Sequence, residues 1–318
     1  MKKVVLIAFA LCFALNSKAQ QDVQLTHWMY DKISYNPAAV GFKDAWCVTA
    51  INRQQWTGFD GGGEPTTTLL NFATPKIGLI KGAVGLSIYN DQVGWETTNV
   101  FRLSYALHLS ELGIKFGPGD LAIGLSAGYA TKVINATWIP PTLITDVSIP
   151  NQNSKDAGLS FNAGLHYATD DWYVGASTTN LSQTELTTLN ITGVRHYYIM
   201  GGYDFNLDPI VGLPVVLRPN VLLKTDATKT QYDFNINVLA FNTVWAGATV
   251  RPGDAIAPMA GLQRQFKNST VQVGYSYGLG TSFLSNYFTN GNHEIMLNYC
   301  FKVVPPVKYE REVHPYLL

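Results

Sequence analysis

Hydrophobic and polar side chains alternate at every second residue along much of the chain from residue 45 onward. In residues 270–279, the odd positions hold Val, Val, Tyr, Tyr and Leu, and the even positions hold Thr, Gln, Gly, Ser and Gly. Because successive side chains of a strand point to opposite faces, such a run predicts a strand with one apolar and one polar face. The same pattern recurs in residues 101–109, 121–130, 158–167 and 232–238.

These runs predict an all-β fold over residues 45–302: a transmembrane antiparallel β-barrel of about 14 strands, with apolar faces toward lipid and polar faces toward the interior. An even number of strands lets both ends of the barrel lie on the periplasmic side of the membrane. The expected strands cover residues 45–56, 66–75, 82–91, 96–109, 119–131, 157–168, 171–180, 195–207, 214–225, 231–240, 242–251, 255–266, 269–279 and 291–302.

The expected connectors differ in length according to their position. Those after odd-numbered strands include the longest ones, and those after even-numbered strands are mostly short. Outer-membrane barrels have short periplasmic turns and longer extracellular loops, so this asymmetry favours a barrel. The long connectors are residues 57–65, 132–156, 181–194 and 280–290, and the short ones lie around residues 169–170, 241 and 267–268.

The composition favours a surface in contact with lipid. Charged residues make up 14% of the chain, against about 25% in soluble domains, and aromatic residues make up 12%. A soluble β-sandwich is the alternative, because its strands also alternate, but so few charges would leave its outer faces poorly soluble. The net charge of zero argues against nucleic acid as a partner, because nucleic-acid binding requires a basic face.

The two ends of the chain are expected to lie outside the barrel. Residues 1–19 have a basic start, an apolar run and small residues before Gln20, which together predict a secretory signal peptide and therefore export. The apolar run is too short to span a bilayer. Residues 303–318 contain two adjacent prolines and several charges, and are expected to form a periplasmic tail.

Residues 20–44 are expected to form an N-terminal periplasmic or plug segment. Leu25, Trp28, Met29 and Ile33 share one face at helical spacing, and this face would be buried in the periplasmic mouth of the barrel. The alternative is a mobile leader, because chain termini are often disordered.

No catalytic site, cofactor or metal site is predicted. The stretch 124–128 matches the G-x-S-x-G pattern of serine hydrolases, but Ser126 stands inside an expected strand and lacks the sharp strand-to-helix turn that exposes such a nucleophile. His293 and Glu294 lack the second histidine of a zinc helix. The inward-facing His108, His166 and His196 have no serine and acid assigned to them by the sequence, so a barrel hydrolase is a distant alternative.

Cys47 and Cys300 are expected to face each other. The first and last strands of a closed barrel must pair antiparallel, because a free edge is not tolerated in lipid. Cys47 lies near the start of the first strand, Cys300 lies near the end of the last, and both have inward parity. A disulfide is therefore geometrically possible in the oxidising envelope. Two buried free thiols are the alternative.

Four stretches of the sequence together form a recognisable pattern. The start of the mature chain reads QLTHWMY, with Gln24 and Met29, and then YNPAAVG, with Asn36, Pro37 and Gly41. The other stretches are RQQWTG, with Arg53, Trp56 and Gly58, and HEIML, with His293 and Glu294. These stretches resemble the PorP/SprF family of type IX secretion membrane proteins, whose opening typically reads like Q-F-S-Q-Y-M-F and then I-N-P-A-x-x-G. Leu25 and Trp28 depart from it, since the family more often has Phe and Tyr there.

The resemblance implies a multi-pass protein of the outer membrane that is a component of the type IX secretion and gliding machinery. Its implied role is to assist the secretion or surface attachment of large adhesin-like client proteins. Its implied partners are outer-membrane lipid, such a client and other type IX components, and no catalytic residue is implied. The alternative function is an outer-membrane channel or hydrophobic-solute transporter, because a barrel of this size has an interior that is either plugged or open.

Overall fold

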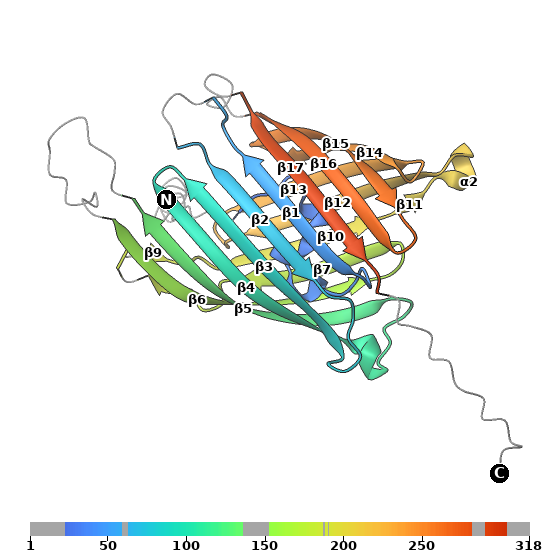
Figure 1. Cartoon of the computed structure of the whole chain (residues 1–318), viewed down its shortest axis with the longest axis horizontal. Helices are drawn as coiled ribbons and strands as arrows, with labels where there is room; N and C mark the ends of the chain where they lie inside the picture. Colours follow the sequence, from blue (N-terminus) through green and yellow to red (C-terminus); the bar gives the residue numbers. More distant parts are fainter. Residues whose placement is uncertain are drawn as a thin grey trace, which may run out of the picture.

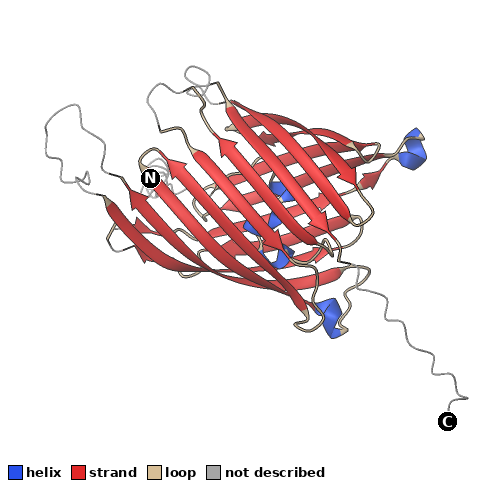
Figure 2. Cartoon of the chain, viewed as in Figure 1, coloured by secondary structure: helices blue, strands red, loops and turns tan. Residues whose placement is uncertain are grey.

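The computed structural model describes residues 23–58, 63–135, 153–186, 188–189, 191–281 and 290–303. The signal peptide expected at residues 1–19 and nearly all of the expected tail lie outside these residues. Within them the chain forms a closed antiparallel barrel of fourteen strands (Figures 1 and 2). The strands are β1 (Trp46–Gln54), β2 (Thr66–Ala73), β3 (Gly82–Val93), β4 (Glu96–His108), β5 (Asp120–Ile134), β6 (Ser154–Ala168), β7 (Trp172–Thr179), β10 (His196–Tyr203), β12 (Val215–Thr225), β13 (Thr230–Ala240), β14 (Val244–Arg251), β15 (Ala255–Gln265), β16 (Ser269–Gly280) and β17 (Asn292–Phe301).

Each barrel strand pairs with its neighbour in the sequence, and two further pairings complete the ring. β1 pairs with β17, and β10 pairs with β12. The short β11 (Phe205–Asn206) follows β10 and also pairs with β12. We call the rim at which β1 begins and β17 ends the terminal rim, and the opposite rim the distal rim.

The alternation in the sequence places apolar side chains outside and polar side chains inside. On β4 and β5, for example, Leu103 and Leu125 are more than half exposed on the outer wall, whereas Ser104 and Ser126 are buried inside. This arrangement inverts that of a soluble protein and suits a wall surrounded by lipid. No helix in the described part of the chain is long and apolar enough to cross a membrane.

Several strand ends differ from the sequence-based expectation. β5 extends to Ile134 and β6 begins at Ser154, so this hairpin is longer than expected, because the backbone ladder between the two strands continues to the pair of Ile134 and Ser154. The expected strand over residues 195–207 is interrupted at Asp204, whose N–H donates to Asp171 O instead of to the adjacent strand. The connector that follows β7 contains a small hairpin of β8 (Glu185–Leu186) and β9 (Ile191–Thr192).

The expected difference between long connectors at the distal rim and short connectors at the terminal rim is only partly observed. Residues 94–95 join β3 to β4 at the distal rim, so not every connector at this rim is long; the expected strands 82–91 and 96–109 already left only a short connector there. At the terminal rim, residues 109–119 contain η4 (Leu109–Leu112), and residues 204–214 contain α2 (Asp208–Val211) as well as β11. The interruption of the strand at Asp204 produces the second of these longer connectors.

The first and last strands close the barrel in the register that aligns the two cysteines. Cys47 is opposite Cys300 in the β1–β17 ladder. Their sulfur atoms form a disulfide, and their Cα atoms are 4.1 Å apart. The link lies at the terminal rim and joins residues 253 positions apart in the sequence.

Residues 23–44 lie inside the barrel, and we call them the plug. They form three short 3-10 helices, η1 (Trp28–Tyr30), η2 (Lys32–Ser34) and η3 (Pro37–Ala39), which Figure 2 shows as blue turns within the ring of strands. The helical spacing of the apolar residues therefore does not correspond to one continuous helix. The plug also reaches beyond the mouth, because Gln24 Nε2 donates to Gln231 Oε1, 2.8 Å away, near the distal end of β13.

Candidate functional site

The plug and the inner wall together form the apolar core inside the lumen. Leu25, Trp28 and Met29 are buried, whereas Ile33 is half-buried and packs in a second cluster with Val40. The wall supplies an unusual set of inward apolar side chains at this level, which would otherwise face a polar lumen. The wall residues of this cluster are Ile51, Leu69, Tyr198, Met200, Leu222, Leu239, Trp245, Met259 and Met296.

A single buried carboxylate binds the first turn of the plug. Glu294 on β17 accepts hydrogen bonds from Thr26 N, His27 N and His27 Nδ1, each 2.7 Å away. Arg53 on β1 is opposite Glu294 in the strand register, and its Nη1 lies 3.1 Å from Glu294 Oε2. Arg53 also donates to Thr26 Oγ1. We call these four residues the Glu294 clamp. All of them are at least 96% buried, so the carboxylate depends on these donors for its solvation.

Three glycines on the wall form a seat for the middle of the plug. Asn36 caps η3 by accepting from Ala38 N, and its Nδ2 donates to Leu165 O at 2.9 Å. A Cβ atom at Gly124 would collide with the backbone of Ala38 and Pro37. At Gly164 and Gly175 it would collide with the amide of Asn36. The backbone of the plug can therefore lie directly against β5, β6 and β7 only because these positions lack side chains.

Further polar contacts bind the plug between the clamp and the terminal rim. Asp31 accepts from Asn71 Nδ2 and from Ser34 Oγ. Arg102 Nη1 donates to Ser34 O at 3.0 Å. These contacts satisfy polar groups of the plug that would otherwise be buried without partners.

The terminal end of the plug is bound by His108. Its Nε2 donates to Val40 O at 2.8 Å, and its Nδ1 lies 2.6 Å from Asp120 Oδ2. Gly41 has a φ of +91°, and a Cβ there would press on His108 Nε2 and Ala83 Cβ. Glycine is therefore required both for the backbone conformation and for the close approach.

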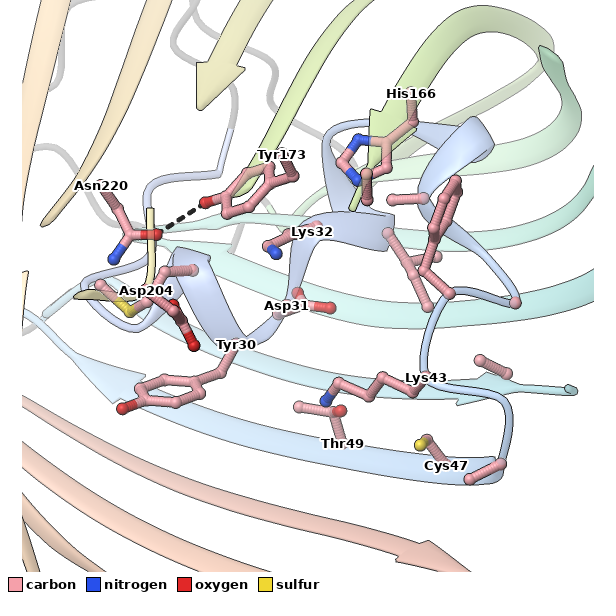
Figure 3. A pocket seen from close by; sticks show the side chains of 18 of the residues that line it. Tyr30, Asp31, Lys32, Lys43, Cys47, Thr49, His166, Tyr173, Asp204 and Asn220 are labelled. Carbon is pink, nitrogen blue, oxygen red and sulfur yellow. Dashed lines mark hydrogen bonds between the residues drawn. The ribbon is translucent and has the colours of Figure 1, made fainter. Parts of the chain in front are cut away.

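Below the plug, toward the terminal rim, lies a cavity of about 330 Å³ that we call the vestibule (Figure 3). The plug forms one side of it and the wall forms the other. Its charged lining includes Lys32 and Lys43 from the plug and the ion pair between Arg218 and Asp204 from the wall, in which Nε and Oδ2 are 3.0 Å apart. The other labelled residues in Figure 3 are Tyr30, Asp31, Cys47, Thr49, His166, Tyr173 and Asn220.

The residues singled out in the sequence fall into two groups in the structure. Met29, Asn36, Pro37 and Gly41 belong to the plug, and Arg53 and Glu294 hold it. Trp56, Gly58 and His293 lie at the distal rim instead: Trp56 N donates to Asn292 Oδ1, Gly58 N donates to Glu64 Oε1, and His293 Nδ1 lies 2.6 Å from the Tyr275 hydroxyl. Arg53 and Glu294 thus form hydrogen bonds with the plug, whereas the hydrogen bond of His293 is made with the wall.

Sequence reasoning missed several of the residues that join the plug to the wall. Thr26, His27 and Arg102 lacked any distinguishing spacing, and their contacts join segments up to 268 positions apart in the sequence. Gly124 was visible only as part of the G-x-S-x-G match. In the structure Gly124 is part of the glycine seat, and Ser126 accepts a hydrogen bond from Asn162 at 2.7 Å. Among the described residues, no three His, Cys, Asp or Glu side chains converge as metal ligands would.

The fold and the lumen define an outer-membrane β-barrel with an internal plug formed by its own N-terminal segment. The pattern of one family matches residues 17–299, and this chain belongs to it: the family of the type IX secretion system membrane protein PorP/SprF. A search of curated proteins finds no match.

Solved structures with a similar fold include outer-membrane channels. The CymD monoaromatic hydrocarbon channel matches with a TM-score of 0.52 and 11% identity, over 86% of this chain and 93% of CymD. The Pseudomonas putida toluene transporter TodX matches with a TM-score of 0.49 and 9% identity, over 85% of this chain and 92% of TodX. At such low identity the likeness shows a shared barrel fold and nothing about a shared ligand.

Proposed function

We propose that this protein assists the secretion or surface attachment of large adhesin-like client proteins as a plugged, non-enzymatic barrel of the type IX secretion and gliding machinery. Membership of the PorP/SprF family is the observation that carries the proposal. The physical contribution of the barrel is a stable docking body in the outer membrane. Its lumen is filled over part of its length by the plug, so that transport through it is not its main activity.

The proposal includes an orientation and a set of partners. Export by a signal peptide at residues 1–19, and an even number of strands, favour a terminal rim that faces the periplasm. The vestibule then opens toward other type IX components, and the loops of the distal rim face the client outside the cell.

Deleting the gene tests this function. We expect the loss of one or a few large proteins from the cell surface, detected by surface biotinylation and mass spectrometry, while proteins exported by other routes keep their level. Complementation with the full chain restores them. Cross-linking in intact cells, followed by purification of the barrel, is expected to recover the same large protein. Unchanged surface proteins would contradict the proposal.

The channel alternative is separated from this proposal by a transport measurement. If the deletion strain keeps its surface proteins and loses uptake of a hydrophobic solute, the protein is a transporter. Contacts of the plug with the wall favour the docking role, because the Glu294 clamp and the glycine seat both bind the plug inside the lumen.

A further inference from the structure

Two neighbouring connectors at the terminal rim expose a group of large apolar side chains. Residues 74–81 join β2 to β3, and residues 109–119 join β4 to β5. We call them the paired connectors, because a Cβ atom at Gly78 in one would lie 3.9 Å from Glu111 Oε2 in the other. Figure 1 shows η4, which belongs to the second connector, in green at the lower end of β4 and β5. Exposed apolar side chains gathered in this way mark a surface that contacts another molecule or a membrane. Leu79 is 91% exposed, and Leu112, Ile114 and Phe116 are each 48% exposed.

Two outward-facing tyrosines hold the paired connectors against the outside of the wall. The Tyr105 hydroxyl donates to Ile80 O at 2.6 Å. The Tyr167 hydroxyl donates to Phe116 O at 2.7 Å and accepts from Gly119 N at 3.1 Å. Both tyrosines have the parity of the exposed apolar residues on β4 and β6. The connectors therefore bend toward the lipid-facing side, and their apolar side chains continue the apolar outer wall.

Exposed lysines accompany these apolar side chains. Lys81 and Lys115 are exposed, and neither has an ion-pair partner among the residues that the structure describes. The third lysine, Lys76, lies 3.6 Å from Asp120. Glu111 is half-buried between the connectors. A lysine beside an apolar surface can lay its stem on that surface and extend its ammonium group to the lipid headgroups.

We propose that the paired connectors are a lipid-binding surface, which inserts its apolar side chains among the acyl chains and places Lys81 and Lys115 beside the phosphates of phospholipid headgroups. Tyrosine is enriched where a membrane barrel crosses the lipid–water boundary, and here two tyrosines fix the connectors at that boundary. A soluble protein is the competing occupant, but it would have to reach a surface that adjoins the lipid-facing wall. In the orientation proposed above, the lipid belongs to the periplasmic leaflet, whereas the lipid contact does not depend on that orientation.

Quenching of a fluorescent label in reconstituted vesicles tests the lipid contact. An NBD group is attached to Leu79→Cys in the full chain, whose Cys47 and Cys300 form the disulfide and do not react. The vesicles contain phosphatidylcholine and phosphatidylglycerol, with doxyl-phosphatidylcholine as the quencher in the acyl region and acrylamide as the quencher in water. The matched control carries the label at Asp170→Cys, an exposed position that lines the vestibule at the same rim.

We expect the label at position 79 to be quenched about threefold more by the doxyl lipid, and about threefold less by acrylamide, than the label at position 170, because an inserted side chain is shielded from water. Equal quenching of the two labels by acrylamide would overturn the lipid contact and would leave the paired connectors to a soluble partner.

Charge reversal tests the role of the lysines. With Lys81→Glu and Lys115→Glu in the labelled chain, doxyl quenching should fall about twofold and acrylamide quenching should rise, because carboxylates are repelled by headgroup phosphates. Lys81→Arg with Lys115→Arg should keep the original quenching. Lys229→Glu, an exposed lysine on the turn between β12 and β13 at the distal rim, should also leave it unchanged. Heat-modifiable migration on gels confirms that each variant is a folded barrel. Unchanged quenching in the charge-reversed variant would overturn the contact of the lysines with the headgroups.

Discussion

The side chain of Glu294 is buried away from water, and the hydrogen-bond donors around it explain why the plug stays bound. It receives two backbone N–H groups and one imidazole N–H from the plug, together with Arg53 from the wall. A buried ion pair adds little net stability when compared with apolar replacements, but removing one partner leaves an uncompensated charge. The clamp therefore opposes release of the plug, since release would break its three hydrogen bonds to the carboxylate and expose the apolar cluster to water.

Glu294→Gln is expected to loosen the plug. The amide oxygen can still accept from one of the two backbone N–H groups, but its NH2 group cannot accept from the other. Arg53 also loses its counter-ion, and together these losses cost about 3 kcal/mol or more. Hydrogen exchange of residues 23–44 in the detergent-solubilised barrel should become at least 100-fold faster. Glu111→Gln, a half-buried glutamate in η4 that lies outside the plug, serves as the control. Equal protection in both variants would show that the clamp does not hold the plug.

Asp31 gives the docking of the plug a pH dependence. Burial raises its pKa to about 6 from its ordinary value of 3.8, and hydrogen bonds from Ser34 and Asn71 offset part of this effect. A carboxyl whose pKa is higher in the docked plug favours docking most below pH 3.8. This contribution falls as the pH rises to about 6 and is constant above that, with a total on the order of 3 kcal/mol.

Asp31→Asn is therefore expected to remove this dependence, because the amide does not ionise. Its oxygen can accept from Asn71, and its NH2 group can donate to the Ser34 hydroxyl in place of the present bond from Ser34. Hydrogen exchange of the plug, corrected for the intrinsic effect of pH, is the measurement. Between pH 4 and 7 the wild-type plug should lose protection, whereas the variant should change little. Asp44→Asn, an exposed position in the same segment, should behave as the wild type. A variant as pH-dependent as the wild type would refute this role for Asp31.

At the scale of elements, the strands β5, β6 and β7 have two different faces for two different reasons. Their outer faces follow the demand of lipid for apolar side chains. Their inner faces carry Gly124, Gly164 and Gly175 because the backbone of η3 lies directly against them. The plug forms short 3-10 helices instead of one α-helix, since each turn is bound by separate groups on the wall.

Gly124→Ala is expected to displace η3 from the wall. The added methyl group would collide with Ala38 and Pro37, and backbone atoms cannot move aside as a flexible side chain would. Overpacking of this kind typically costs about 1–3 kcal/mol. Limited proteolysis of the plug should accelerate, while the barrel keeps its β-rich circular dichroism. The control is Gly201→Ala, where the nearest atom to the new Cβ is 3.4 Å away, and faster proteolysis there as well would point to a general loss of stability.

At the scale of the whole molecule, a ring of fourteen strands encloses more space than its own inward side chains fill. The plug supplies the missing volume with Leu25, Trp28 and Met29, and the wall matches it with its own inward apolar residues. The vestibule is the space that remains at the terminal rim. The plug thus occupies part of the lumen in the part of the chain that the structure describes, and we expect it to close the barrel to ions.

Planar-bilayer recordings should reflect this closure. We expect the full chain to pass little current, and a variant that lacks residues 23–38 to form conducting pores, because the polar inner wall would then line a water-filled lumen. The variant must first show heat-modifiable migration on gels, which reports a folded barrel. High conductance of the full chain would contradict closure by the plug and would favour the channel alternative.

The sequence by itself determined the barrel, because the period of two and the demand of lipid for apolar side chains act at each strand independently. It also predicted the antiparallel meeting of β1 with β17, and with it the alignment of Cys47 and Cys300, which follows from closure. The family motifs marked Asn36, Pro37 and Glu294 without indicating what these residues contact.

Only the tertiary structure decided how the interior is filled. The sequence predicted a helical plug in the mouth, but the plug rises through the lumen as separate turns. Its position depends on contacts between residues far apart in the chain, such as Thr26 with Glu294 and Asn36 with Leu165. The periodicity of a strand or helix carries no information about such long-range contacts. The glycine seat acquires its role only when barrel closure brings the wall around the plug, because the effect of a missing side chain is recognisable only from what lies opposite it.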